Sequence, residues 1–228
     1  MPYNSTITFT LDTICPWTYL GFVRLRKALT SWTSSNPNSP VTFTLRLAPY
    51  QLYPDFSMEG RDKYEWYKKE RYNDSPERMQ MYIDYMTALG KDDGITFDFS
   101  GGTIANTLHA HRILQYLQNN KPPAHAIRAL ESLYDSYFSH RAHPASHETL
   151  TKACLAAGLS EHEAKALVED DGEELMETKM AIREQVGNAV DSVPYVVFEG
   201  KRRDFTLVGA KSVEDYVKVL GQVEKEAS

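Results

Sequence analysis

The sequence predicts an α/β fold in which a large all-helical insertion interrupts a small frame of strands and helices. Strand, helix and strand patterns follow one another within residues 1–50, and strand patterns almost vanish over residues 51–188. A strand pair and a final helix then occupy residues 189–228. We therefore predict one domain built from residues 1–50 and 189–228, and a helical insertion domain over residues 51–188.

The first segment has the pattern of a βαβ unit. Apolar residues alternate with threonines over 7–11, as in a half-buried strand. Pro16 marks the first turn of a helix, where a missing backbone N–H costs nothing, and helical spacing continues to Leu29. A loop rich in Ser, Asn and Pro over 33–40 leads into a second alternating strand over 41–47. A helical crossover of this kind predicts two parallel strands.

Amphipathic patterns predict a series of helices in the inserted block, over residues 75–89, 104–117, 124–138, 146–157, from 160 onward and over 173–186. Ser160 and Glu163 have the spacing of a capping box, which marks a helix start. Apolar runs over 195–198 and 205–208 predict an antiparallel hairpin. A last helix is expected over 212–224.

Charge and composition exclude several classes of function. The 228 residues carry a formal net charge of −6, whereas nucleic-acid binding calls for a basic face. No apolar run approaches the roughly 18–20 residues of a membrane span, and the first ten residues lack a secretory signal pattern. Two cysteines in such a chain indicate a reducing compartment. We therefore expect a cytoplasmic protein with neither a nucleic-acid nor a membrane partner.

The most informative motif is Cys15-Pro16-Trp17-Thr18, which follows the first strand and opens the first helix. It has the form of a dithiol redox motif with a threonine in the place of the second cysteine. Backbone N–H groups at a helix N-terminus lower the pKa of a thiol, so we predict a reactive Cys15 thiolate that has no internal disulfide partner. The alternative is a small buried cysteine that only packs.

These residues resemble the DsbA-like thioredoxin superfamily, and within it the FrnE-like branch, whose members carry Cys-Pro-Trp-Cys-Tyr-Leu-Gly. This chain matches that motif from Cys15 to Gly21 except at Thr18. Further matching positions are Asn106-Thr107, His111-Arg112, Val193-Pro194 and Val208-Gly209-Ala210. The resemblance implies a thioredoxin-like fold with a helical insertion. The branch is also similar to kappa-class glutathione transferases and 2-hydroxychromene-2-carboxylate isomerases, which use glutathione and usually carry serine at the nucleophile position.

The resemblance assigns roles to particular residues. Cys15 is the expected nucleophile, and Thr18 either donates a hydrogen bond to its thiolate or is a plain helix residue that replaced a cysteine. Pro194 is expected to be cis, which would turn the Val193 backbone toward Cys15 and offer it to glutathione. The remaining residues expected to contact glutathione or substrate are Pro16, Trp17 and Asn106. For Asn106 the alternative is a local hydrogen bond early in a helix.

Other candidate residues have simpler explanations. Cys154 could act as a resolving thiol, but it shares a helical face with apolar residues and is more simply a packed core cysteine. The many aromatic residues over 58–86 could wall an aromatic-substrate pocket, although core packing is the commoner explanation. His140, His143 and His147 have a loose metal-like spacing, but Pro144 interrupts the helix that would align them. No metal is therefore expected.

One activated sulfur without a partner supports three kinds of chemistry. It can form and release a mixed disulfide with glutathione, add reversibly to a conjugated double bond, or orient bound glutathione for transfer. We predict a glutathione-linked thiol oxidoreductase or isomerase with glutathione as cosubstrate. The alternatives are a glutathione-dependent isomerase or transferase acting on an aromatic or polyketide-like small molecule, and a non-catalytic binding module. The sequence does not determine the oligomeric state, for which a homodimer is one alternative.

Overall fold

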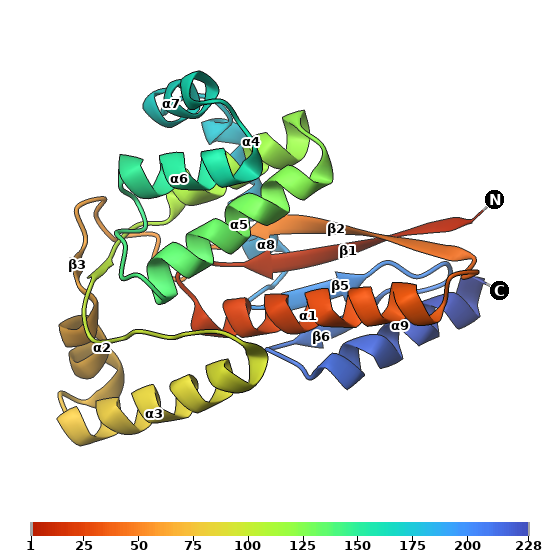
Figure 1. Cartoon of the computed structure of the whole chain (residues 1–228), viewed down its shortest axis with the longest axis horizontal. Coiled ribbons are helices and arrows are strands. Elements are labelled where there is room, and N and C mark those ends of the chain that lie inside the picture. The colour runs from red at the N-terminus through yellow and green to blue at the C-terminus, as the bar shows by residue number, and fades with distance from the viewer. Residues whose placement is uncertain (1, 228) are drawn as a thin grey trace. The chain divides into compact units, whose positions relative to one another are not determined.

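A computed structural model describes residues 2–227, and its central feature is a four-stranded mixed sheet (Figure 1). The strands are β1 (Tyr3–Leu11), β2 (Val41–Pro49), β5 (Tyr195–Phe198) and β6 (Phe205–Val208), in the order β2-β1-β5-β6. β1 and β2 are parallel over their whole length, from Tyr3 opposite Val41 to Leu11 opposite Pro49. β5 is antiparallel to both β1 and β6. The predicted parallel pair and the predicted hairpin are therefore confirmed.

Helices α1 (Pro16–Ser35) and α9 (Val213–Ala227) pack side by side against this sheet (Figure 1). α1 is longer than predicted, because residues expected in the loop continue the helix to Ser35. Thr30 and Thr33 fit this helix by donating their hydroxyls to the carbonyl oxygens four residues earlier, at 3.0 and 2.9 Å. The helix ends at Asn36, whose backbone N–H and carboxamide both donate to the carbonyl oxygen of Trp32.

The chain forms two compact units. The first contains the described residues up to Tyr50 and those from Ala181 onward, and the second is Gln51–Met180. The division thus falls inside α8 (Leu175–Gly187), whereas the sequence placed it after residue 188. A hydrogen bond of 3.0 Å from the Thr10 hydroxyl to the Gln185 side-chain oxygen joins the second half of α8 to β1, which explains the difference.

The second unit is almost entirely helical. Its helices are α2 (Lys63–Tyr72), α3 (Pro76–Asp93), α4 (Leu108–Asn120), α5 (Pro123–Phe138), α6 (His147–Ala157), α7 (Glu161–Glu169) and the first half of α8. The two-residue strands β3 (Arg61–Asp62) and β4 (Thr103–Ile104) pair antiparallel, which the sequence did not predict. α6 ends at Gly158 in a left-handed conformation, and the capping box of Ser160 and Glu163 opens α7, as predicted.

α2 was missed in the sequence because nine of its ten residues are charged or tyrosine, which hides the apolar period. The signal that could have revealed it is Asp62, whose carboxylate accepts the backbone N–H of Glu65 as an N-cap. On its inner side Trp66 and Tyr67 are buried and contact one another edge to face at 5.1 Å between ring centroids. These two aromatic residues of the segment therefore contribute to a core.

Lys63, at the start of α2, is a fully buried cation. Its ammonium group donates to the carbonyl oxygens of Asp98 and Tyr137 at 3.3 and 3.4 Å and lies 4.6 Å from the centre of the Tyr137 ring. Burial lowers the pKa of Lys63 to about 8, mainly because the charged form has lost its water. This side chain joins three segments of the second unit at one point.

None of the helices in the described part of the chain combines the length and apolarity that a membrane span requires.

Candidate functional site

Cys15 is the N-cap of α1, directly after the turn that follows β1. Its backbone N–H donates to the carbonyl oxygen of Asp12 at 3.1 Å, which closes the turn. Its own carbonyl oxygen accepts the backbone N–H groups of Thr18 and Tyr19 at 3.1 and 3.3 Å, which begins the helix. Pro16 occupies the first helical turn, where the backbone N–H that proline lacks would have no partner within the helix. The motif residues thus hold the sulfur at a helix N-terminus by local backbone bonds.

The Cys15 thiol lies against the segment that leads into β5. Sγ is 3.8 Å from the carbonyl oxygen of Val193, to which the thiol donates a weak hydrogen bond. The Val193–Pro194 peptide bond is cis, as predicted. Cys15 and Val193 are both buried, with 5% and 9% of their surfaces exposed. The turn after β1 and the segment before β5 therefore contact each other at Cys15 Sγ.

Gly21, one turn after the motif, lies where there is little room for a side chain. A Cβ atom at this position would lie 2.9 Å from Cγ of Pro194 and 3.4 Å from the hydroxyl of Tyr216. The glycine thus lets α1 pass close to the loop before β5 and to α9. Sequence reasoning counted Gly21 in the motif without giving it a role.

Thr18 is fully buried, and its hydroxyl faces the backbone of the turn. Oγ1 is 2.8 Å from the carbonyl oxygen of Asp12 and 2.7 Å from that of Cys15. A hydroxyl has one proton, so it donates to one acceptor at a time. Thr18 therefore stabilises the turn that carries the sulfur, and its hydroxyl is also one of the groups that lower the pKa of the Cys15 thiol.

Burial raises the pKa of the Cys15 thiol to about 12. The hydrogen bonds from the backbone N–H groups of Thr18 and Trp17 and from the Thr18 hydroxyl lower this pKa, while the negative charge of Asp12 raises it further. The predicted thiolate-favouring pKa is therefore wrong for this closed arrangement, because the helix N-terminus does not compensate for the lost hydration. Trp17 is the exposed member of the motif, with 36% of its surface accessible.

A sequence profile described as DSBA-like thioredoxin domain matches residues 6–221, nearly the whole chain. The chain belongs to the DsbA-like thioredoxin domain family. No curated protein sequence matches it.

Solved structures of DsbA-like proteins share this fold. A probable DsbA oxidoreductase from Streptomyces coelicolor has a TM-score of 0.82 at 21% identity, with 97% of this chain and 91% of that one covered. A 2-hydroxychromene-2-carboxylate isomerase has a TM-score of 0.63 at 13% identity, covering 95% of both chains. The cytosolic disulfide reductase DsbM from Pseudomonas aeruginosa, solved with GSH, has a TM-score of 0.60 at 16% identity, covering 95% and 98%. At these identities the likeness establishes the DsbA-like fold alone.

Asn106, in the second unit, was predicted to contact glutathione or substrate. Its side chain instead makes all of its possible hydrogen bonds to other residues of this unit. Its carboxamide nitrogen donates to the carbonyl oxygens of Pro54 and Phe56 at 2.8 and 3.0 Å. Its oxygen accepts the backbone N–H of Leu108 at 2.8 Å and the Gln51 amide at 2.9 Å. Both donors and both lone pairs are thereby occupied. This favours the alternative of a local structural role over glutathione binding.

Arg112 belongs to the His-Arg pair of the resemblance, and the structure gives it a packing role. The side chain is fully buried, and its guanidinium donates to the carbonyl oxygens of Leu167 and Glu173 at 2.9 and 3.3 Å. It thereby joins α4 to the end of α7 and to the turn before α8. Cys154 is also fully buried, and burial raises the pKa of its thiol to about 12, as expected for a packed core cysteine.

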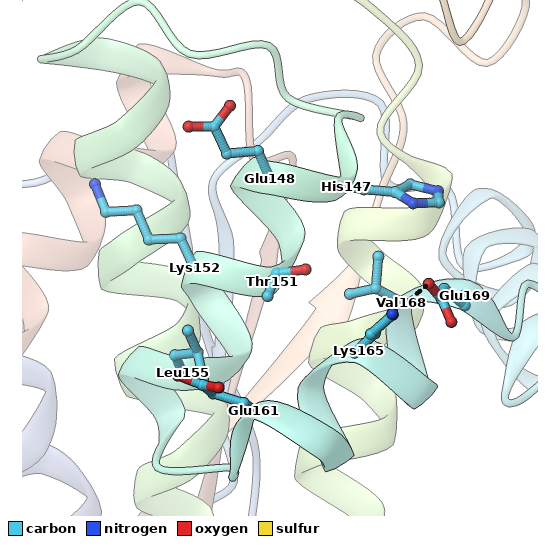
Figure 2. Close-up of a pocket in the computed structure, with 9 residues that line it drawn as sticks. All are labelled: His147, Glu148, Thr151, Lys152, Leu155, Glu161, Lys165, Val168 and Glu169. Carbon is cyan, nitrogen blue, oxygen red and sulfur yellow. Dashed lines mark ion pairs between the residues drawn. The ribbon is translucent and has the colours of Figure 1, made fainter.

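A hollow of about 690 Å³ lies between α6 and α7 (Figure 2). Leu155 and Val168 lie among the charged side chains that line it, and Figure 2 shows the ion pair of Lys165 and Glu169, at 3.8 Å, on α7. Carboxylates and ammonium groups alternate around the lining, which is typical of a solvated groove between surface helices. His147 is one of the lining residues. His143, by contrast, uses both ring nitrogens in hydrogen bonds to the backbone of Glu59 and Ala145.

Proposed function

We propose that this DsbA-like protein is a thiol oxidoreductase or isomerase that uses Cys15 as its single nucleophile and glutathione as its second thiol. The observation that carries the proposal is the contact of 3.8 Å between Cys15 Sγ, at the N-terminus of α1, and the carbonyl oxygen of Val193. A backbone carbonyl beside a nucleophilic sulfur can accept the N–H of an extended peptide such as glutathione. Trp17 and Pro194 would flank such a ligand.

Thr18 decides what kind of redox chemistry is available. Because no second sulfur stands one turn into α1, Cys15 must exchange with a thiol or disulfide from solution. The Cys15 thiolate attacks the glutathione sulfur of a substrate–glutathione disulfide, so that a Cys15–glutathione bond forms and the substrate leaves as a thiolate that takes up a proton. A second glutathione thiolate then attacks the bound glutathione sulfur and releases Cys15 and glutathione disulfide. The net reaction converts the substrate–glutathione disulfide and one glutathione into the substrate thiol and glutathione disulfide, so one glutathione sulfur is oxidised as the substrate sulfur is reduced.

The reaction requires Cys15 to gain access to solvent. With its pKa raised to about 12, the buried Cys15 thiol stays protonated at pH 7. Burial is the largest cause of this high pKa, whereas the three hydrogen bonds from Trp17 and Thr18 act in the opposite direction. When solvent or a ligand opens the site, these hydrogen bonds favour the thiolate. We therefore propose that the reactive Cys15 thiolate forms when the site is open to solvent or ligand.

The test is glutathionylation followed by mass spectrometry. Incubation with glutathione disulfide should add one glutathione to Cys15, and reduced glutathione should remove it. The Cys15→Ser variant should take up none, whereas Cys154→Ser should behave as the parent protein does, because Cys154 is buried in the core of the second unit. The proposal fails if Cys15 of the folded protein stays unmodified over hours while the urea-unfolded chain reacts.

A second candidate is a non-catalytic binding module of the same fold, which the burial of Cys15 and its high pKa favour. Iodoacetamide alkylation against pH separates the two. If the protein is a thiol enzyme, its open form should give an alkylation step below a pH of about 8.5, the free-cysteine value. If it is a binding module, Cys15 should stay buried and no such step should appear.

Within the enzyme proposal, isomerase or transferase chemistry on an aromatic or polyketide-like small molecule is distinguished by the nucleophile. If Cys15→Ser with glutathione still turns over an enone substrate, glutathione carries out the attack and the protein sulfur does not. We also propose a reducing compartment such as the cytoplasm, since glutathione is maintained there in its reduced form. Both cysteines are free in the structure.

A further inference from the structure

A separate hollow of about 370 Å³ lies at the far end of α1, away from its catalytic-motif end. Its walls come from the last turns of α1, from the loop over 36–40 and from the start of β2. Leu29 and Trp32 line it from α1, and Val41 and Phe43 line it from β2. The Trp32 and Phe43 rings meet edge to face, with their centroids 6.4 Å apart. All of these residues belong to the first compact unit.

The chemistry of this hollow selects for an uncharged ligand. Every described side chain that lines it is uncharged, and the polar ones are hydroxyls and the Asn36 carboxamide. That carboxamide already donates to the backbone oxygen of Trp32 at 3.0 Å. A charged ligand would thus lose water without gaining an ion pair, which costs free energy. A flat apolar body, in contrast, can lie against the indole of Trp32 and the ring of Phe43.

Trp32 carries a buried polar group next to the hollow that lacks a hydrogen-bond partner in the described part of the chain. Its indole is 9% exposed, and Nε1–H is buried without a hydrogen-bond acceptor among the described residues. The far edge of the ring rests on α9, where a Cβ at Gly221 would lie 3.6 Å from it. A buried donor without an acceptor weakens the fold until a partner supplies an oxygen. The nitrogen is covered, so a ligand must tilt the indole to reach it.

We propose that this hollow, formed by Leu29, Trp32, Asn36, Val41 and Phe43, binds a small neutral aromatic molecule whose carbonyl oxygen accepts the Trp32 indole N–H. The site is distinct from that of Cys15, because Trp32 lies 17 residues later on the same helix, about 25 Å along its axis. The proposal therefore does not depend on the thiol chemistry of Cys15.

Indole N–H resonances in nitrogen–proton correlation spectra test this directly, because the chain has three tryptophans, Trp17, Trp32 and Trp66. Acetophenone is the probe, since it joins an aromatic ring to one neutral carbonyl. It should move the Trp32 indole proton downfield and leave the other two indole signals in place. Ethylbenzene, which lacks the oxygen, should bind about fivefold more weakly without the downfield shift, and benzoate should not bind.

The Trp32→Phe variant keeps an aromatic ring and removes the N–H, and it also assigns the Trp32 signal by its loss. Acetophenone should bind this variant about fivefold more weakly, as followed by the backbone amide signals of Val41 and Phe43, while Trp17→Phe should bind it unchanged. The proposal is overturned if acetophenone leaves the Trp32 signal of the parent protein unmoved, or if acetophenone, ethylbenzene and benzoate shift all three indole signals alike.

Discussion

Replacing Thr18 with valine removes one buried hydroxyl from the turn that carries Cys15 and keeps the volume of the side chain. The carbonyl oxygens of Asp12 and Cys15 lose this donor but keep backbone N–H partners, from Cys15 for the first and from Thr18 and Tyr19 for the second. Since no acceptor is stranded, the expected loss is that of one net hydrogen bond, about 1 kcal/mol. For a chain of this size that corresponds to a fall in Tm of roughly 2–4 °C.

The same substitution should also act on the sulfur. The Thr18 hydroxyl is one of the three hydrogen-bonding groups that lower the pKa of Cys15, so removal of this hydroxyl should raise that pKa further. We expect iodoacetamide to alkylate Cys15 about threefold more slowly at pH 8, which corresponds to a hydrogen bond of less than 1 kcal/mol. Alkylation is followed by mass spectrometry at several pH values, and stability by thermal unfolding.

Thr18→Ser is the matched control. It keeps the hydroxyl and deletes a buried methyl group, so it should destabilise the protein by a similar amount, about 1 kcal/mol, without slowing alkylation. Equal alkylation profiles for the valine and serine variants would refute the reasoning, because the hydroxyl would then have no influence on the thiol.

Two further predictions concern the second unit. Lys63 loses its proton near pH 8 when folded and near 10.5 when unfolded, so the unfolded state binds more protons between these values and the unfolding free energy should rise with pH by about 3 kcal/mol. Urea titrations at pH 7 and 10.5 should show this rise reduced in Lys63→Met and retained in Lys68→Met. Lys68 forms ion pairs with the exposed carboxylates of Glu65 and Asp74. An equal rise in both variants would contradict the assignment to Lys63. Asn106→Ala should cost about 2–4 kcal/mol in urea unfolding, because four hydrogen bonds are lost, whereas Asn120→Ala, which loses one exposed bond, should cost less than about 0.5 kcal/mol. Similar losses of unfolding free energy in the two variants would show that the four hydrogen bonds of Asn106 contribute no more than the one exposed bond of Asn120.

The frame of the fold was predictable because its signals are local. Alternation over 7–11 and 41–47 determined the strands of the parallel pair, and Pro16 marked the helix start within one residue. α2 was missed because all ten of its residues are charged or aromatic, so its buried residues, Lys63, Trp66 and Tyr67, form no apolar period in the sequence.

The candidate site was only partly predictable. The position of Cys15 at a helix N-terminus follows from the motif, but its burial depends on Val193, 178 residues away along the chain. Asn106 shows the same limit, since its partners Gln51 and Pro54 lie more than 50 residues earlier and no local pattern announces them. Chemistry that depends on exposure is set by contacts between distant segments, which a local motif does not report.

The threonine at position 18 also determines what an oxidised form of this protein must contain. A dithiol motif becomes lighter on oxidation, because its internal disulfide forms with the loss of two hydrogens. At Cys15, with Thr18 as its neighbour, a disulfide can form only by adding the atoms of another molecule. The oxidised species is then heavier than the reduced one, and its mass identifies the partner. The intact mass of the protein purified without reductant is thus a direct record of which thiol it last encountered.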